Sequence, residues 1–334
     1  MNLDELDAVA RGAAPTGTGA DRRTHTVPLF KGAASHYHVR VGIGRLRARA
    51  WIAGVRERRA LAEVRSFVQF TGFPRSGHSL VGALLDAHPN VAIAHELDAT
   101  GLFAKGIPAG ALPALALDGA RRFRAAGRWW NGLGYEVRDA PPETTLLVVG
   151  DKKGDWTSRW CALEPDLPAR LRAAAPWRTP YVLVTRHPLD NIATMSLRLG
   201  RAYDRLRIGC AGEAFGAALK RAQAAGEIAA AVPDAMIDDY EGLCAATEAM
   251  RRRVPAEDWH ALRYEAMVER PTDAFAELAG FLGLPAERRW IDAASDLVGA
   301  GGRSRDKLRW TEAQRVRVDG IVARYAILHG YLDG

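Results

Sequence analysis

Short apolar runs separated by amphipathic stretches recur along the chain, and they predict strands that alternate with helices. Buried strands are expected at residues 67–70, 91–94, 145–149 and 181–185, with a short one starting at 259. Helices are expected at residues 45–65, 79–87, 188–197, 212–231, 236–252 and 312–330. This alternation favours a single α/β domain with a central, mostly parallel sheet and helices on both faces.

The places where the alternation starts and pauses predict the domain organisation. Residues 1–44 are rich in Gly, Ala and Thr and have weak periodicity, so we expect an irregular N-terminal arm. The α/β domain then occupies residues 45–334. Residues 97–144 show no clear strand and indicate an insertion of helices and loops that shapes a binding pocket.

The connection between the first strand and the helix after it carries the most chemical information. Gly72-Phe73-Pro74-Arg75-Ser76-Gly77 forms a turn between them, and His88-Pro89-Asn90 ends the helix. A strand, a glycine-bounded loop and a helix together can cradle an anion with backbone N–H groups and the helix dipole. Gly- and Pro-rich turns also occur in α/β domains without any ligand, so the rest of the chain must decide.

The spacing within this connection is that of a P-loop. Gly72 and Gly77 fit the frame G-x-x-x-x-G, and Ser79 stands where a P-loop has Ser or Thr. An ATP or GTP site needs Lys before that hydroxyl, and here the residue is His78. The frame therefore predicts a phosphate-like ligand, but the residue that reaches the terminal phosphates of ATP is missing.

Residues 73–79, Phe-Pro-Arg-Ser-Gly-His-Ser, resemble the 5′-phosphosulfate loop of the sulfotransferases that use 3′-phosphoadenosine 5′-phosphosulfate (PAPS). The family loop typically reads Pro-Lys/Arg-Ser-Gly-Thr-Thr/Ser, so His78 replaces a usual Thr. The resemblance implies a P-loop-like sulfotransferase fold. It also implies that the 5′-phosphosulfate is held by the loop residues Arg75, Ser76, Gly77, His78 and Ser79.

A second family signature follows the strand at 181–185. In the family an Arg at this strand end, and a Ser eight residues later, clamp the 3′-phosphate of PAPS. Those positions are Arg186 and Thr194 here, with Ser196 as an alternative hydroxyl. A planar guanidinium with paired donors suits a phosphate.

The resemblance also implies the catalytic groups. A glutamate shortly after the second strand is the general base in several branches, and Glu96 matches it, with His95 as the second choice. A lysine after the next strand stabilises the leaving oxygen in the family. Lys152 is the better match and Lys153 the alternative. An ion-paired or helix-capping role for Glu96 remains open.

The C-terminal third adds supporting matches. Residues 264–271 resemble a family segment whose tyrosine touches the adenine, so the resemblance gives that role to Tyr264. Many members close the 3′-phosphate site with a basic loop near the C-terminus. Arg303, Arg305 and Lys307 are the candidates here.

Composition places the chain among ordinary globular proteins. Apolar residues make up 48% and charged residues 25% of its 334 residues, and the net charge is +7. No segment approaches the ~20 apolar residues that span a bilayer. The acidic start lacks a signal-peptide pattern, and the three cysteines are scattered. We therefore expect a cytoplasmic protein.

Much of the positive charge lies in one predicted helix. Residues 45–65 hold seven arginines and two glutamates, a net of +5, interleaved with apolar residues at helical spacing. Such a helix can contact a membrane surface, or it can pack on the domain with a solvated basic face. We expect no nucleic-acid partner.

The sequence as a whole predicts transfer of a sulfuryl group from PAPS, without a metal. The acceptor is expected to be a hydroxyl of a carbohydrate, lipid or other small molecule. Two alternatives remain: a P-loop kinase or NTPase that uses Mg²⁺, with Asp151 as its metal ligand, and a non-catalytic anion-binding protein.

Overall fold

The structure is a computed structural model that describes residues 43–130, 133–141, 144–198, 202–209, 212–299 and 303–332. Nearly all of the arm predicted at residues 1–44 lies outside these ranges. Among the described residues, no helix is both long and apolar enough to cross a membrane.

The central sheet is formed by five short strands. They are β1 (Ser66–Gly72), β2 (Val91–His95), β5 (Val148–Lys152), β6 (Tyr181–Thr185) and β7 (Trp259–Arg263). A separate two-residue hairpin consists of β3 (Trp129–Trp130) and β4 (Leu133–Gly134). β1 and β6 are buried along their whole length, as expected of strands covered on both faces.

Helices make up most of the remaining described chain. The α-helices are α2 (Ile43–Arg56), α3 (His78–Asp86), α4 (Ala99–Ala104), α5 (Leu112–Ala125), α6 (Gly154–Leu163), α7 (Leu167–Ala174), α8 (Pro188–Leu197), α9 (Ala202–Gly209), α10 (Gly212–Ala224), α11 (Asp234–Arg251), α12 (Tyr264–Glu269), α13 (Pro271–Leu282), α14 (Arg288–Leu297) and α15 (Glu312–Arg324). The 3₁₀ turns are η2 (Ala109–Ala111), η3 (Ala256–Asp258), η4 (Ser304–Lys307) and η5 (Ala326–Tyr331).

All five strands of the central sheet run parallel in the order β2-β5-β1-β6-β7. The prediction of an α/β domain with a mostly parallel sheet is confirmed. β1 lies in the middle, with β5 on one side and β6 on the other. The segment after β1 therefore lies at the centre of the sheet's carboxyl edge.

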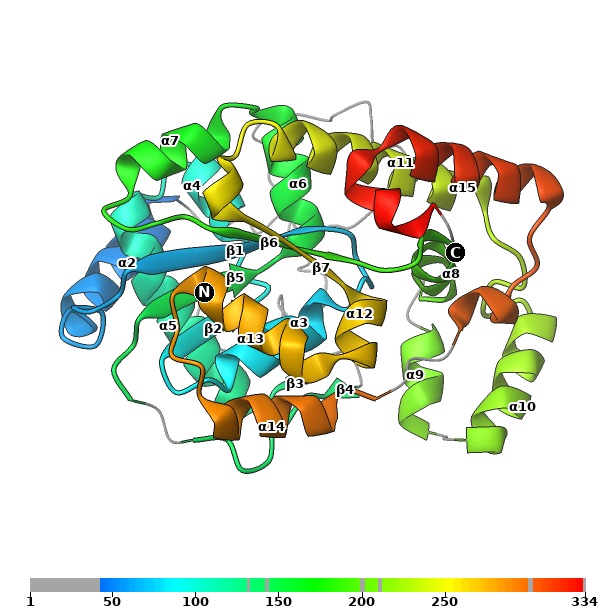
Figure 1. The fold of residues 1–334 in the computed structure, drawn as a ribbon, viewed down its shortest axis with the longest axis horizontal. Helices are drawn as coiled ribbons and strands as arrows, with labels where there is room; N and C mark the ends of the chain where they lie inside the picture. The colour runs from blue at the N-terminus through cyan, green and yellow to red at the C-terminus, as the bar shows by residue number, and fades with distance from the viewer. Residues whose placement is uncertain are drawn as a thin grey trace.

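The two faces of the sheet are covered by different helices (Figure 1). Val68 and Phe70 of β1 pack in one apolar cluster with α3, α13 and α14. Phe67 points to the opposite face, in a cluster with α5, and Thr71 on that face contacts α6 and α11 through Ser158 and Met250. This alternation along β1 explains why the sequence run 67–70 predicted a buried strand.

Several predicted elements differ from the structure in their bounds. The helices predicted at 212–231 and 312–330 end earlier, at Ala224 and Arg324, and the second is followed by the separate turn η5. The strand predicted at 145–149 is β5 at Val148–Lys152, because Gly150 lets the backbone lie against Val68 of β1 and Asp151 has backbone partners inside the fold. The helix predicted at 45–65 ends at Arg56, and its residues 57–63 form turns. For this strand and for this helix, polar residues near the true end made that end hard to place from the sequence.

Candidate active site

The predicted site motifs all lie at the carboxyl edge of the central sheet. The loop at residues 73–77 follows β1, Lys152 ends β5, Arg186 follows β6, and Tyr264 follows β7. Connections from β1 and its neighbours pass to opposite sides of the sheet at this edge. Such switch points form the ligand crevices of open α/β sheets.

Two residues in the left-handed backbone region shape the loop between β1 and α3. Arg75 has a φ of 67°, and Gly77 has a φ of 105°. A Cβ at residue 77 would lie 2.6 Å from Cδ2 of the Tyr264 ring, so the loop needs glycine there. Gly77 makes no side-chain cap for α3, which leaves the first N–H groups of α3 for an anion.

The loop is held in place by hydrogen bonds from two helices. Asn191 of α8 donates from Nδ2 to the carbonyl oxygen of Pro74 at 2.8 Å. The hydroxyl of Ser158 on α6 accepts from the backbone N–H of Gly72 at 2.9 Å. These bonds fix the backbone before a ligand arrives, which is the property that an anion cradle requires.

The side chains of the loop do not all point toward a ligand. The Ser76 hydroxyl is buried and donates to the carbonyl oxygen of Phe73 at 3.1 Å, and His78 Nδ1 lies 3.4 Å from it. Burial, followed by the charge of Lys152, lowers the pKa of His78 to about 3, so its ring is neutral. Ser76 and His78 can therefore serve an anion through their backbone N–H groups, whereas Ser79 is partly exposed.

Arg75 lies at the open side of the loop. Its guanidinium is partly exposed and lies 3.9 Å from the carboxylate of Asp204 on α9. At that distance the ion pair is weak and partly exposed, so an incoming dianion can replace it. Asp204 is also bound by Arg198 at 3.0 Å, and this pairing holds it beside the loop.

The second predicted phosphate site is assembled around Arg186. Its Nη1 donates to Oγ1 of Thr194 at 3.3 Å, and its guanidinium carbon lies 5.2 Å from the centre of the Tyr264 ring. The structure thus brings Arg186, Thr194 and Tyr264 together. The alternative hydroxyl, Ser196, is fully buried and donates to the carbonyl oxygen of Ile192, so it does not take part.

Glu96 lies between the two candidate lysines. Lys152 donates to its Oε1 and Lys153 to its Oε2. Burial by itself would raise the pKa of Glu96, but the charges of Lys152 and Lys153 outweigh it, so the pKa lies well below its usual range. Glu96 is ionised at neutral pH, and of the open alternatives the structure shows the ion-paired one.

Lys152 is a fully buried ammonium at the end of β5. Its side chain passes against α3 at Gly82, where a Cβ would lie 2.8 Å from Cγ of the lysine. Burial lowers its pKa, and Glu96 partly restores it. Lys153 is also buried, and the pairing with Glu96 raises its pKa. Both lysines can supply positive charge to the crevice.

Asp151 holds the loop that carries Glu96. Its two carboxylate oxygens accept from the backbone N–H groups of Leu97 at 2.9 Å and Ala99 at 2.8 Å. Glu96 and Asp98, on either side of Leu97, have φ values of 68° and 63°. This segment is therefore strained, and its hydrogen bonds to Asp151 hold it in place. The carboxylate of Asp151 is therefore engaged by backbone donors, and it holds this loop in place.

His95, the second choice for the base, packs against α5. Its ring stacks on Phe123 of α5 at a centroid distance of 4.3 Å. Burial, with the charge of Lys152, lowers the pKa of His95 well below its usual value. His95 is neutral but is packed between aromatic rings.

The three basic candidates near the C-terminus have different surroundings. Arg305 donates to Asp190 from its backbone N–H at 2.8 Å and from Nη2 at 2.8 Å, and its Nη1 lies 2.9 Å from His187. Arg305 thus docks η4 onto the start of α8. Arg303 is exposed, and Lys307 lies over the ring of Phe215 at 5.8 Å.

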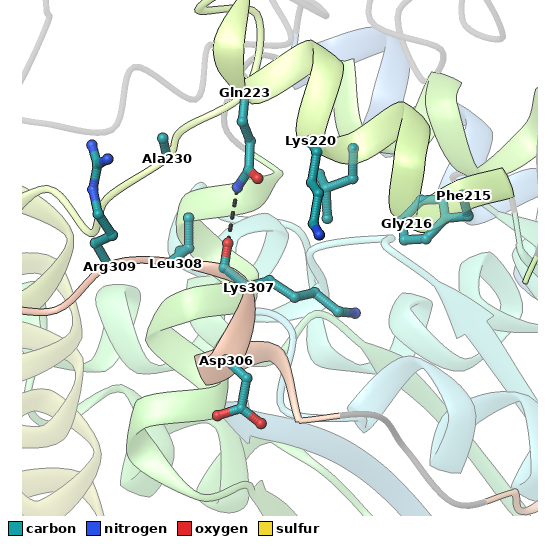
Figure 2. Close-up of a pocket in the computed structure, with 10 residues that line it drawn as sticks. Phe215, Gly216, Lys220, Gln223, Ala230, Asp306, Lys307, Leu308 and Arg309 are labelled. Carbon is teal, nitrogen blue, oxygen red and sulfur yellow. Dashed lines mark hydrogen bonds between the residues drawn. The ribbon is translucent and has the colours of Figure 1, made fainter. Parts of the chain in front are cut away.

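A cavity of about 620 Å³ lies between α10 and the segment 306–309 (Figure 2). Phe215 and Leu219 form its apolar wall, and Lys220 and Lys307 also line it. Gln223 donates to the carbonyl oxygen of Lys307 at 2.9 Å and ties the two sides together. Of the predicted residues, Lys307 alone lines this cavity, so the cavity is separate from the Arg186 cluster.

Two residues that position the site were not singled out from the sequence. Asn191 holds the loop after β1, and Asp190 binds Arg305. Both lie in the first turn of α8, directly after the Arg186 motif. A carboxylate and an amide at the start of an otherwise apolar helix were the available signal, but their partners are distant in the sequence.

Searches with the sequence and with the structure gave different results. No protein-family model and no curated protein matched the sequence. Solved sulfotransferase structures matched the fold. The sulfotransferase domain of the Synechococcus PCC 7002 olefin synthase is 14% identical, with a TM-score of 0.42, and the match covers 78% of this chain and 94% of that one.

Two further sulfotransferases are similar to this chain. The enzyme from Alicyclobacillus acidocaldarius is 16% identical, with a TM-score of 0.42, and the match covers 81% of this chain and 96% of that one. Mouse SULT7A1, solved in complex with PAP, is 11% identical, with a TM-score of 0.37, and the match covers 81% of this chain and 87% of that one.

Among the described residues, no three His, Cys, Asp or Glu side chains are arranged so that they could hold a metal ion. Cationic side chains near the strand ends are Arg75, Lys152, Lys153 and Arg186, and Glu96 pairs with both lysines. An anion is the ligand that such a crevice favours.

Proposed function

We propose that the protein transfers a sulfuryl group from PAPS to a hydroxyl group of an acceptor. The observation that carries the proposal is the packing of Tyr264. Its ring lies against Gly77 of the first loop and under the guanidinium of Arg186. The two candidate anion-binding elements therefore lie on either side of one aromatic side chain. This spacing suits a nucleotide with phosphates at two positions of its ribose.

The first element would hold the 5′-phosphosulfate. The backbone N–H groups of residues 76–79 and the positive end of α3 supply donors, and the partly exposed hydroxyl of Ser79 and guanidinium of Arg75 add to them. His78 is neutral, so it adds no charge of its own. Replacement of the usual Thr therefore costs the cradle one hydroxyl and leaves its backbone donors.

The second element would hold the 3′-phosphate. Arg186 offers a planar set of donors, and Thr194 adds a hydroxyl in contact with it. Tyr264 would then contact the adenine. Exposed Arg303 is the residue of the basic loop that can close this site, because Arg305 is already bound to Asp190.

The lysine and glutamate pair suits acid–base chemistry at this position. The donor supplies an activated sulfuryl group, and its leaving oxygen gains negative charge as the S–O bond breaks. Lys152 can stabilise that negative charge. The leaving oxygen and Glu96 then compete for the ammonium group of Lys152. A weaker hold by Lys152 raises the pKa of Glu96, which makes Glu96 a stronger base for the proton of the acceptor hydroxyl.

The ligand preference tests this proposal. Saturating 3′-phosphoadenosine 5′-phosphate should raise the melting temperature clearly more than ATP with Mg²⁺. A ligand present at 100 times its Kd adds about 2.7 kcal/mol to the free energy of unfolding. Arg186→Ala should weaken this bisphosphate by about 1.5–3 kcal/mol and 5′-AMP far less, because a charge-assisted hydrogen bond is lost.

Arg263→Ala is the matched control for the Arg186 substitution. Arg263 is the last residue of β7. Its guanidinium lies over the ring of Tyr331 at 5.6 Å, as that of Arg186 lies over Tyr264, but Arg263 is not part of the proposed 3′-phosphate site. It should leave nucleotide affinity unchanged. Stabilisation by ATP with Mg²⁺, and none by the bisphosphate, would favour the kinase alternative and reject our proposal.

A further inference from the structure

The surface of α2 exposes apolar side chains that no other described part of the chain covers. Trp51 is 71% exposed, Ile52 58% and Val55 59%. Together with exposed Ala48 they occupy positions i, i+3, i+4 and i+7, which is one face of an α-helix. Three of the seven most exposed large apolar side chains among the described residues thus form a single stripe.

The opposite face of α2 is the one that packs on the domain. Ala50 is 1% exposed and Ala53 is 8% exposed, and the helix lies against α5 and η2. The sequence offered a packed helix with a solvated basic face as one of two alternatives. The structure uses small alanines for packing and leaves the large apolar residues outside.

Positive charge borders this stripe. Arg56 at the end of α2 and Arg58 and Arg59 just beyond it are exposed. Of the acidic side chains nearby, Glu57 is buried and bound by Arg56 at 2.8 Å and Arg121 at 2.7 Å, Asp118 lies 3.8 Å from Arg56, and Glu63 is exposed. Positive charge still exceeds negative charge in this segment, because the sequence of 45–65 has a net charge of +5.

We propose that α2 docks the protein on an anionic lipid surface, with Trp51, Ile52 and Val55 inserted at the headgroup level. A helix with an apolar stripe, a tryptophan and flanking arginines has the features of interfacial membrane helices. The lipid supplies both apolar surface and negative charge. A nucleic acid supplies the charge alone, and a second copy of this face brings arginines against arginines.

The position of α2 makes this docking compatible with the proposed active site. α2 precedes the amino end of β1, whereas the site lies at the carboxyl edge of the sheet. In Figure 1, α2 lies at the left of the molecule and α8 at the right. A protein bound through α2 keeps the crevice open to ligands, so α2 variants should retain nucleotide binding.

Sedimentation with vesicles tests the proposal on the full chain. Wild-type protein should bind vesicles of phosphatidylcholine and phosphatidylserine at 70:30 at least tenfold more tightly than vesicles of phosphatidylcholine. The triple variant Trp51→Ser, Ile52→Ser, Val55→Ser should lose this binding. The matched control changes Leu163, Val316 and Leu332, exposed apolar residues elsewhere, to Ser and should bind as wild type does.

The charge contribution is tested with a second pair of variants. Arg58→Gln with Arg59→Gln should weaken binding to the anionic vesicles by about 25-fold, since each basic residue near such a surface is worth about fivefold. Arg270→Gln with Arg288→Gln has the same net charge, changes two exposed arginines elsewhere, and should have little effect.

Three outcomes would overturn the proposal. Equal binding of the wild type and the triple Ser variant to anionic vesicles would show that the stripe is not the contact. Absence of vesicle binding, with a dimer that the triple variant dissociates, would assign the stripe to a second copy. Absence of both vesicle binding and self-association would also reject it. Unchanged nucleotide binding by the triple variant verifies that it is folded.

Discussion

At the scale of single residues, the position of Glu96 between two lysines determines what it can do. An ion-paired carboxylate with a pKa well below its usual range keeps its charge but binds a proton weakly. Its backbone has a φ of 68°, a conformation that costs free energy and that Asp151 stabilises through the next residues. This strained backbone holds the Glu96 carboxylate beside the end of β5.

Glu96→Gln tests the role of this carboxylate. The substitution removes the base, so turnover should fall by ~10²–10⁴-fold while bisphosphate binding is nearly unchanged. It also leaves Lys152 buried with one charged partner fewer, so the melting temperature should fall as well. Steady-state kinetics and calorimetry on the same preparation separate the two effects.

Glu57→Gln is the matched control for that substitution. Glu57 is also a buried carboxylate between two cations, Arg56 and Arg121, but it lies on α2's side of the domain, away from the site. It should lower stability without lowering turnover. If Glu96→Gln keeps turnover within a few-fold of wild type, the base must be sought at His95.

The sequence predicted where functional residues lie better than it predicted where their side chains point. The pattern of apolar and polar residues placed the loop residues, Lys152 and Arg186 at strand ends. It could do so because the periodicity of a strand or helix depends only on residues close together in the sequence. It could not show that the Ser76 hydroxyl turns inward to Phe73. Nor could it show that Arg305 is bound by Asp190, since that pair joins residues far apart in the chain.

At the scale of elements, the connection between β1 and α3 depends on one glycine. Gly77 combines a φ of 105° with contact against the Tyr264 ring. Gly77→Ala should therefore lower the free energy of unfolding by about 1–2 kcal/mol for the left-handed backbone, plus the cost of displacing Tyr264. Bisphosphate affinity should fall too, because Tyr264 also packs on Arg186.

A second glycine separates these two effects. Gly226 has a φ of 75°, and a Cβ there would have no atom within 4 Å. Gly226→Ala should show the backbone cost alone, with unchanged bisphosphate affinity in isothermal titration. If both variants bind the bisphosphate as tightly as wild type, the packing of Tyr264 on the loop has no part in the site.

At the scale of the whole molecule, buried histidines and buried aspartates act in opposite directions on stability as the pH falls. Burial and then Lys152 lower the pKa of His78 to about 3, against an ordinary value of 6.5, and His95 is lowered in the same direction. Between those pH values the unfolded chain binds protons at these histidines that the folded chain excludes, so the histidines lower stability as pH falls below about 6.5. Burial raises the pKa of Asp98 to about 6 and of Asp151 to about 7, and these two groups act in the opposite sense.

His78→Thr isolates one proton of this response. Between pH 4 and 6 the slope of the variant's free energy of unfolding against pH should be less positive than that of the wild type, by up to about 1.4 kcal/mol per pH unit. The measurement is urea unfolding at several pH values. His329→Thr, on η5 at the surface, is the control and should keep the wild-type slope. Identical slopes for all three proteins would mean that His78 takes up a proton in the folded state.

The order of strands in the sheet has a consequence for how the protein emerges from the ribosome. β1 and β2 are made early, but neither pairs with the other, and both wait for β5 at residues 148–152. β1 gains its second neighbour only when residues 181–185 have been made. Contacts between distant segments form slowly and leave strand edges exposed until then. The loop between β1 and α3, although encoded in the first quarter of the chain, can become rigid only after more than half of the protein has been synthesised.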